Sequence, residues 1–520
     1  MKNINIADSF NVELKEDENV DNTRRKVFEA AYSFVTPLQP SKPQLIHVSM
    51  DMAKSLGIDP KSVHSEEFLN IVSGKEVYPN TRPYAMAYAG HQFGSWAGQL
   101  GDGRAINLFE VEHNHKRWAL QLKGAGPTPY SRQGDGLAVL RSSIREYLCS
   151  EAMFHLNVPT TRALSLVLTG DEVLRDMLYD GNAAYEKGAI VCRVAPTFIR
   201  FGNFELFAAR QDFKNLKALT DYTIRYFFPH LGAPSKEVYI SFFREVANRT
   251  LDMIVHWQRV GFVHGVMNTD NMSILGLTID YGPYGWLEGF DFGWTPNTTD
   301  RQNKRYRYGN QPNIALWNLL QLANALFPLV EEAKPFEAIL HKYQTDFDQK
   351  FLDMMRSKLG LQTSSKQDKS LIDNLQDCLL MAETDMTIFF RNLASYEKDK
   401  DAIKAILMPA LYRPKEISPK SLELWSQWFK AYGQRLGKET LSNKARKGAM
   451  NKINPKYVLR NYMAQMAIDE ANGGNYQLIE ELFTMLKKPY DEQTEYEKWF
   501  AKRPEWARHK VGCSMLSCSS

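Results

Sequence analysis

Three oxygen-bearing side chains near the middle of the sequence are the strongest candidates for chemistry. Asp270 and Asn271 end the segment 262–271, and Asp280 follows an apolar stretch. Carboxylate and amide oxygens are the ligands that magnesium and manganese prefer when they bridge nucleotide phosphates. We expect Asn271 and Asp280 to be metal ligands, and Asp270 to accept a proton from an incoming hydroxyl. The alternative is that these side chains only cap turns.

The spacing of this segment is that of a protein-kinase catalytic loop with one residue changed. Kinases have His-Arg-Asp, four residues and Asn, followed later by Asp-Phe-Gly. His264 and Asn271 keep that spacing, but Val266 occupies the place of the catalytic Asp. The kinase Asp orients and deprotonates the substrate hydroxyl, so its absence indicates retained nucleotide binding with altered transfer chemistry. We expect His264 to be a structural loop residue.

A second Asp competes for the position of the metal ligand. Asp291-Phe292-Gly293 is a literal kinase triplet, whereas Asp280 is followed by Tyr281 and Gly282. Asp280 directly follows the strand-like stretch 274–279 and is closer to Asn271 in the sequence. Asp291 lies among glycines and aromatic residues in an expected loop. We therefore assign the metal to Asp280.

Two predicted strands and a helix upstream supply a cation and a carboxylate. Residues 105–111 and 117–123 alternate as strands do, with a turn between them. Lys123 falls opposite the larger apolar face of its strand, where it can point into a cleft. Apolar residues at helical spacing predict a helix over 137–155, which carries Glu146. The two side chains are candidates for a phosphate-binding ion pair, and the alternative is that both are solvated.

Glycine-rich segments on both sides of these strands are further candidates for nucleotide contacts. Gly101, Gly103 and Arg104 directly precede the first strand. Glycines let main-chain amides approach phosphates, and an arginine adds charge-assisted bonds, although an ordinary tight turn has the same pattern. Asp135 and Gly136 end a second glycine-rich loop. Asp135 can reach a ribose or base, or it can cap the helix that follows.

Arg193 and Arg200 flank an apolar run, which is an unusual place for guanidinium groups without anionic partners. Phosphate binding is one use for them. Structural ion pairs with Glu205 or Asp212 are the other.

Composition limits the remaining possibilities. The chain has 520 residues, which favours two or three lobes, and its net charge of +4 indicates no dominant nucleic-acid surface. The absence of a long apolar run and of a basic, apolar leader predicts no membrane span, no secretory signal and a cytoplasmic location. Five scattered cysteines give no zinc spacing. Cys513 and Cys518 lie in a polar tail that has either a redox role or exposed, untethered thiols.

The glycine-rich segments, the hairpin, the helix and the loop described above together resemble the selenoprotein O family, also called the YdiU-type protein adenylyltransferases. The similarity extends from about residue 80 to residue 315, with weaker matches at both ends. The blocks that match are 88–94, 99–105, 120–126, 140–146 and 264–271.

The resemblance implies an α+β, protein-kinase-like bilobal fold with a largely helical C-terminal extension. It implies binding of ATP in a flipped orientation with Mg²⁺ or Mn²⁺, and transfer of AMP to Ser, Thr or Tyr hydroxyls of proteins with release of pyrophosphate. Nucleic-acid and membrane partners are not implied. By motif, the resemblance implies an ion pair between Lys123 and Glu146 and a proton acceptor in Asp270. It implies that Asn271 and Asp280 bind the metal. The residues that it implies as nucleotide contacts are Asp280, Lys123, Gly101, Gly103, Arg104, Asp135, Gly136, Arg193 and Arg200.

One departure from the family pattern concerns redox control. Many members carry a cysteine after the metal site that can pair with a C-terminal cysteine. The corresponding stretch here, 294–300, has none, so we do not expect this form of gating. Cys518 is nearest to the position at which some eukaryotic members have selenocysteine.

The sequence predicts four segments. These are a leader with a helix at 25–35 (1–80), a kinase-like N-lobe (81–200), a catalytic and metal-binding C-lobe (201–320), and a helical region with a mobile tail (321–520). Two other functions stay open: a true kinase with Asp270 as base, and a nucleotide-binding scaffold without activity. The intact set of Lys123, Glu146, Asp270, Asn271 and Asp280 argues against the scaffold.

Overall fold

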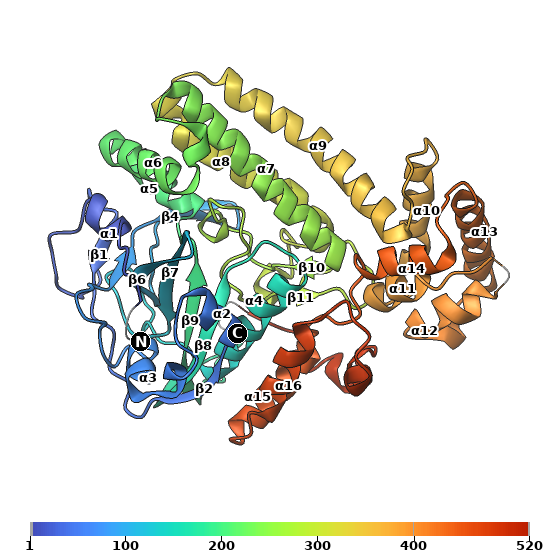
Figure 1. Ribbon diagram of the computed structural model, residues 1–520, viewed down its shortest axis with the longest axis horizontal. Helices are drawn as coiled ribbons and strands as arrows, with labels where there is room; N and C mark the ends of the chain where they lie inside the picture. The colour runs from blue at the N-terminus through green and yellow to red at the C-terminus, as the bar shows by residue number, and fades with distance from the viewer. Residues whose placement is uncertain (1–3, 399, 518–520) are drawn as a thin grey trace.

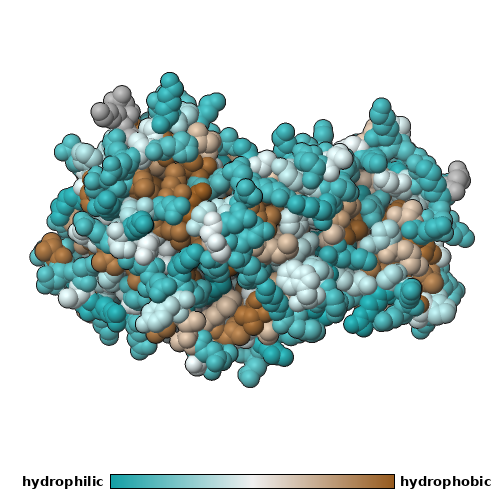
Figure 2. All heavy atoms as spheres, turned by 90° about the horizontal axis from the view of Figure 1, so that it is seen from below, coloured by the Kyte–Doolittle hydropathy of each residue, from teal (hydrophilic) through white to brown (hydrophobic). Residues whose placement is uncertain are grey.

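The molecule is a mixed α and β structure with antiparallel sheets, seen in a computed structural model that describes residues 4–398 and 400–517. Figure 1 shows most of the strands gathered at one end of the molecule and the helices of residues 368–451 at the other. Long helices lie along one side of the sheet-containing part and extend toward the helical end. Figure 2 shows a mostly polar face on which apolar side chains gather in a few separate areas.

A seven-stranded antiparallel sheet forms the framework of the first half of the chain. Its strand order is β1-β3-β6-β7-β9-β8-β2, so β7 lies at the centre. The strands are β1 (Tyr32–Phe34), β2 (Gln44–Val48), β3 (Tyr84–Met86), β6 (Ala105–His113), β7 (Lys116–Lys123), β8 (Arg162–Arg175) and β9 (Ala184–Ala195). Two small sheets pair β4 (Ala89–Gln92) with β5 (Ser95–Gln99) and β10 (Phe262–Val263) with β11 (Gly285–Trp286).

The predicted hairpin before Lys123 is confirmed as β6 and β7. Asn114 and His115 connect the strands with φ angles of 50° and 59°. Positive φ at both central residues is what a two-residue hairpin turn needs to match the twist of its strands. In the register of β7 and β9, Gln121 lies opposite Arg193. The hairpin thus brings Lys123 to the sheet centre, next to a strand that carries an arginine.

The helix predicted over 25–35 is wrong. The structure has irregular chain there, followed by β1, which pairs with β3 through Tyr32 and Met86. The Tyr32 ring packs against the rings of Phe10 and Tyr84, with centroids 5.9 and 5.2 Å apart. Strand pairing and aromatic burial therefore decide the local structure, as expected when tertiary contacts override a weak local preference.

Helices cover the sheet and continue into a long stack. The helix predicted over 137–155 is α4 (Leu140–His155), which packs on β8 and β9. The helix expected before His264 is α7 (Lys236–Val260), which ends at Gly261 in the left-handed conformation. Figure 1 shows α7 beside α8 and α9. The remaining helices of this part are α1 (Phe10–Glu13), α2 (Met50–Ser55), α3 (Glu66–Val72), α5 (Phe201–Ala209), α6 (Phe213–Phe227), α8 (Gln311–Val330) and α9 (Lys334–Leu359).

The C-terminal helices form two groups. One group surrounds its own core, which includes Phe389, Trp425 and Trp428, and lies at the far end of Figure 1. It consists of α10 (Asp368–Leu380), α11 (Met386–Leu393), α12 (Met408–Ala410), α13 (Pro419–Leu436) and α14 (Asn443–Asn451). The other group, α15 (Asn461–Asn472) and α16 (Gln477–Leu486), returns to pack on α4.

The division into four segments stays a prediction. Strands β1 and β2 precede residue 81 and yet belong to the large sheet. Helix α8 runs through residue 320.

Among the described residues, one stretch, 308–330, is long and apolar enough to cross a membrane by length and composition. Half of its most apolar window is buried inside the protein. Helix α8 within it packs on α5, α7 and α9, as a core helix does.

Candidate functional site

An ion pair between the central strand and α4 begins the site. Nζ of Lys123, the last residue of β7, lies 2.5 Å from Oε2 of Glu146. Nη1 of Arg193, from the adjacent strand β9, donates to the other oxygen of Glu146 at 3.1 Å. Burial lowers the pKa of Lys123, and the neighbouring carboxylate of Glu146 opposes that shift. The structure therefore brings together three side chains that the sequence placed on separate elements.

Asp280 is the anion at which the cations of the site converge. Its carboxylate accepts one hydrogen bond from Arg193 and one from Arg200, while Lys123 Nζ lies 3.9 Å away. Burial alone would raise the pKa of Asp280, but Arg200, Arg193 and Lys123 outweigh burial and hold it well below the usual range. Asp280 has φ of 56°, an uncommon conformation for a residue other than glycine and one that is found at functional sites.

The loop that carries Asp270 and Asn271 is tied to the same cluster. Arg200 Nη1, which bonds Asp280, also donates to the main-chain carbonyl of Asp270 at 3.0 Å. Asn271 donates its side-chain amide to the carbonyl of Val266 at 2.9 Å, which fixes the amide group and leaves its oxygen available. The two expected metal ligands and the expected proton acceptor thus lie on segments that a single guanidinium joins.

Asp270 is buried and incompletely hydrogen-bonded. Gln92 Nε2 approaches its Oδ2 at 3.4 Å, and Oδ1 has no partner. Burial raises the pKa of Asp270 to about 7, and the nearby Arg200 opposes the shift. Gly90 closes the site on this side, since a Cβ there would lie 2.9 Å from Oδ1 of Asp270. A buried carboxylate with one unpaired oxygen has the chemistry of a proton acceptor.

His264 and Asp291 take no part in this cluster. His264 is buried, its Nε2 bonds the carbonyl of Ile279 at 2.8 Å, and its ring stacks on Trp257. The contacts of His264 agree with the structural role that we expected. Asp291 accepts a hydrogen bond from Gly293 N at 2.7 Å and lines a different hollow. Of the two competing acids, only Asp280 reaches the cations.

The glycines before β6 pack against their own chain. Gly101 has φ of 85°, and a Cβ there would lie 2.4 Å from the Tyr130 ring. A Cβ on Gly103 would lie 2.8 Å from the carbonyl oxygen of Tyr130. The close approach to Tyr130 is sufficient to explain both glycines, and their contact with a nucleotide stays a prediction. Arg104 is partly exposed and close enough to Lys123 to lower its pKa.

Asp135 and Gly136 contact other parts of the chain, and Gly136 packs against Gly126 and Pro127. Asp135 is exposed and forms a double ion pair with Arg175 at 2.7 and 2.8 Å. It accepts from Leu137 N rather than capping α4, whose N-cap residue is Val139. The structure does not bring Asp135 together with Asp270 or Asp280. A nucleotide contact from this loop stays a prediction.

The alternative partners proposed for the two arginines are wrong. Glu205 bonds His91 at 2.6 Å, and Asp212 caps α6. Arg193 and Arg200 are both buried and still hold unmet donors, Nε of Arg193 and Nη2 of Arg200. Buried donors without acceptors are costly, and an anionic ligand would satisfy them.

Three further residues hold the site together, and sequence reasoning did not assign them a role. Gln121 accepts a hydrogen bond from Arg193, Asp102 lies 4.0 Å from Arg200, and Gln92 contacts Asp270. Gln121 falls on the same face of its strand as Lys123. Strand alternation was therefore a signal that could have identified it.

The oxygen atoms of Asn271 and Asp280 fit a hard divalent cation as ligands. Among the described residues, no group of three or more His, Cys, Asp or Glu side chains is placed to hold a metal. Magnesium bound with nucleotide phosphates needs only one or two protein oxygens, because phosphates and waters complete its shell. The free amide oxygen of Asn271 and the carboxylate of Asp280 are such oxygens.

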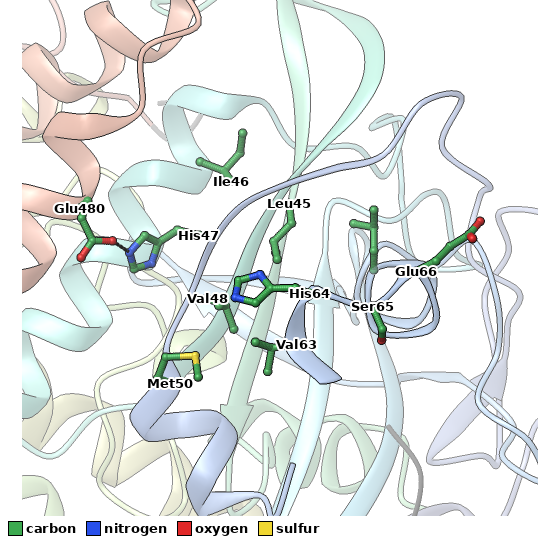
Figure 3. Close-up of a pocket in the computed structure, with 11 residues that line it drawn as sticks. Leu45, Ile46, His47, Val48, Met50, Val63, His64, Ser65, Glu66 and Glu480 are labelled. Atoms are coloured by element: carbon green, nitrogen blue, oxygen red, sulfur yellow. Dashed lines mark hydrogen bonds and ion pairs between the residues drawn. The ribbon is translucent and has the colours of Figure 1, made fainter. Parts of the chain in front are cut away.

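A separate hollow of about 630 Å³ lies at the outer edge of the sheet, between β2, α3 and α16. Figure 3 shows His47 and His64 projecting among the apolar side chains that line it. His47 Nε2 bonds Glu480 at 2.6 Å, and its Nδ1 bonds the hydroxyl of Tyr147 at 2.7 Å. The hollow contains none of the predicted site residues, but Tyr147 adjoins Glu146 on α4.

The C-terminal tail is anchored as far as it is described. Cys513 is buried, and burial raises the pKa of its thiol to about 11. The Leu516 carbonyl accepts from Thr298 N at 2.7 Å, so the tail lies against the loop 294–300. The expectation of an untethered tail with an exposed thiol is therefore wrong for Cys513. Cys518 lies outside the described residues.

Comparison with known proteins identifies the family. Residues 18–487 match the family model described as Protein adenylyltransferase SelO. The chain is 62% identical to the protein nucleotidyltransferase YdiU of Flavobacterium johnsoniae, over the full length of both chains. It is 53% identical to the YdiU proteins of Rhodopirellula baltica and Aromatoleum aromaticum, over 98% and 100% of each chain.

The chain belongs to the SelO family of protein adenylyltransferases. It is an enzyme, and its class is the nucleotidyltransferases.

Proposed function

We propose that this enzyme transfers AMP from ATP to Ser, Thr or Tyr hydroxyls of protein substrates and releases pyrophosphate. The observation that carries the proposal is the buried carboxylate oxygen of Asp270 that has no hydrogen-bond partner, beside a cluster of cations with unmet donors. The acid that a kinase would use is replaced by Val266. The family and the names of the relatives support nucleotidyl transfer, and the geometry supports the finer assignment of roles.

The residues of the chain divide the work of the reaction. The Asp270 carboxylate accepts the proton of the acceptor hydroxyl, and the hydroxyl oxygen forms a bond to the α-phosphorus of ATP. The bond from that phosphorus to the oxygen bridging the α- and β-phosphates breaks, and its electron pair leaves with pyrophosphate. Lys123, Arg193 and Arg200 bind the phosphates through charge-assisted hydrogen bonds. Gln92 and Gly90 hold Asp270 in place.

Mg²⁺ or Mn²⁺ held by Asn271 and Asp280 would neutralise phosphate charge. Asp280 is ready for this role because Arg193, Arg200 and Lys123 keep its carboxylate ionised. Gly101, Gly103, Arg104, Asp135 and Gly136 complete the proposed nucleotide contacts.

We also propose that the sheet with α4 and the helices around α7 correspond to the two lobes of a protein-kinase-like fold. A central strand with Lys123, a helix with Glu146 and a loop with Asn271 occur in kinase order, which supports this correspondence. Our proposal for the location is the cytoplasm, with no nucleic-acid or membrane partner. The small net charge of +4 supports the exclusion of nucleic acid.

Parallel incubations with α-labelled and γ-labelled ATP test the reaction. With a generic protein acceptor, only the α-label should enter protein, and intact mass should rise by one adenylyl group. The Asp270→Asn variant should transfer no label while its melting temperature still rises on addition of ATP. Protein labelled only from γ-labelled ATP would overturn the proposal in favour of a kinase.

A further inference from the structure

The β4–β5 hairpin joins the expected proton acceptor to the protein surface. His91 N donates to Thr269 Oγ1 at 2.7 Å, and Phe93 N donates to Asn268 Oδ1 at 3.1 Å. Gln92, between them, contacts Asp270. Three consecutive residues of the hairpin thus hold three consecutive residues of the catalytic loop. Whatever binds the outer side of this hairpin lies next to Asp270.

The outer side of the hairpin exposes aromatic rings. Phe93 and Trp96 are 37% and 45% exposed, although both are large apolar side chains. Phe93 is held against Tyr306, with ring centroids 5.3 Å apart, and Trp96 against His91 at 5.0 Å. Fixed, exposed aromatic rings lose little freedom when a partner covers them, which is why such rings are common in protein-binding surfaces.

A cationic segment lies beside these rings. Residues 301–307 include four cations and no acid, and among the described residues none of the four forms an ion pair. The buried carboxylate of Asp300 shapes the segment by accepting from Arg305 N at 2.9 Å and Tyr306 N at 2.7 Å. A Cβ on Gly94 of the hairpin would lie 3.2 Å from the Arg305 guanidinium, so segment and hairpin are in contact. The four cations are Arg301, Lys304, Arg305 and Arg307.

A hollow of about 300 Å³ continues this surface. Its lining includes Arg301, Lys304, Pro296 and Asn297, and also the acid Asp291. Asn297 Nδ2 also donates to the carbonyl of Gly265 at 3.0 Å, in the loop that leads to Asp270. The hollow and the cationic segment therefore share Arg301 and Lys304, and Asn297 links the hollow to the loop that leads to Asp270.

We propose that Phe93, Trp96 and the cationic segment 301–307 form the surface that binds the acceptor protein, and that this surface selects hydroxyls flanked by acidic residues. The inference rests on the proposed function. The occupant is the acceptor because Gln92 of the hairpin contacts Asp270, whereas the expected phosphate-binding cations Arg193 and Arg200 are buried. Arg301 and Lys304 are exposed, and cations without ion-pair partners complement acidic side chains and give specificity through electrostatic attraction.

The test uses two peptides of equal length that carry the same central hydroxyl residue, one flanked by Asp and Glu and the other by Lys and Arg. Binding is measured by fluorescence anisotropy at low salt, and AMP transfer by kcat/KM. The wild-type enzyme should favour the acidic peptide about tenfold or more in both measurements. R301E/K304E should lose that preference while its ATP-induced thermal shift is unchanged. Trp96→Ala should weaken both peptides and keep their ratio.

A matched control separates local from overall charge. Lys444 and Lys447 are exposed cations on α14, in the C-terminal helical group. K444E/K447E changes the net charge by the same amount as R301E/K304E and should keep the preference. Equal binding of the two peptides by the wild type, or an equal loss of preference in both variants, overturns the inference. Acid-selective binding without transfer of AMP would instead contradict the proposed function.

Discussion

Nζ of Lys123 lies 2.5 Å from Oε2 of Glu146, and the two groups come from the central strand and from α4. Burial lowers the pKa of Lys123, so the ammonium depends on this carboxylate to remain charged. Breaking a buried pair by removing one partner leaves an uncompensated charge, which is far more costly than the pair itself is stabilising. The position of α4 therefore controls the charge of the site.

The first prediction concerns this pair. Lys123→Met and Glu146→Gln should each lower the free energy of unfolding by about 3–5 kcal/mol, because each removes one partner from a buried charge cluster. The double variant should lose less than the sum of the single losses. Urea denaturation of the four proteins measures the coupling. Losses that add to within about 0.5 kcal/mol would show that the two residues act independently.

The second prediction separates charge from shape at the arginines. Arg193→Ala and Arg200→Ala should each cost about 3–5 kcal/mol of stability, because each leaves Asp280 short of a buried partner. Arg193→Lys and Arg200→Lys should have a higher free energy of unfolding than the alanine variants. Their ATP-induced thermal shift should still be smaller than that of the wild type, because lysine lacks the guanidinium fork. Arg413, an exposed residue paired with Glu416 at 3.4 Å, is the control.

Arg413→Ala should cost less than about 1 kcal/mol, as exposed ion pairs do. A full ATP-induced shift in both lysine variants would contradict a phosphate-binding role for the arginines.

The third prediction distinguishes the two competing acids. Asp280→Asn should reduce AMP transfer by about 100-fold or more, since a metal clamp on phosphates is worth several kcal/mol. Asp291→Asn should keep near-normal activity because Asp291 contacts Gly293 and not the cations. Initial rates with α-labelled ATP provide the comparison. The reverse pattern would move the metal site to Asp291.

The fourth prediction tests why Gly101 is a glycine. Gly101→Ala places a Cβ 2.4 Å from the Tyr130 ring at φ of 85°, so both strain and collision oppose it. Gly98 has φ of 68°, and a Cβ added there would have no atom of another part of the chain within 4 Å. Gly98→Ala should therefore cause backbone strain without a collision. We expect Gly98→Ala to cost about 1–2 kcal/mol and Gly101→Ala clearly more, measured by urea denaturation. Equal losses would mean that Tyr130 moves aside and that packing does not explain Gly101.

Short-range pattern predicted the elements around the site well. The hairpin of β6 and β7 and the helix that carries Glu146 followed from alternation and helical spacing, while the assignment of the metal to Asp280 rather than Asp291 stays a prediction. Each depends on residues that are neighbours in the sequence. The helix over 25–35 failed because β1 forms there only through pairing with β3, some 50 residues later in the chain.

The long-range part of the site could not be predicted in this way. Gln92 reaches Asp270 across 178 residues of sequence, and Asp280 reaches Arg200 across 80. Periodicity has no information about which loops meet. The partners expected for Arg193 and Arg200 were wrong because acids near in sequence were preferred to an acid that only the fold brings close.

The bridge from Glu480 through His47 to Tyr147 has a consequence for synthesis of the enzyme. A nascent chain that has emerged as far as residue 320 contains every residue to which we assign a role in catalysis. It lacks α15 and α16, which pack on α4, the helix that carries Glu146. We therefore expect an unfinished chain of this length to be a poorer catalyst than the chain that includes α15 and α16.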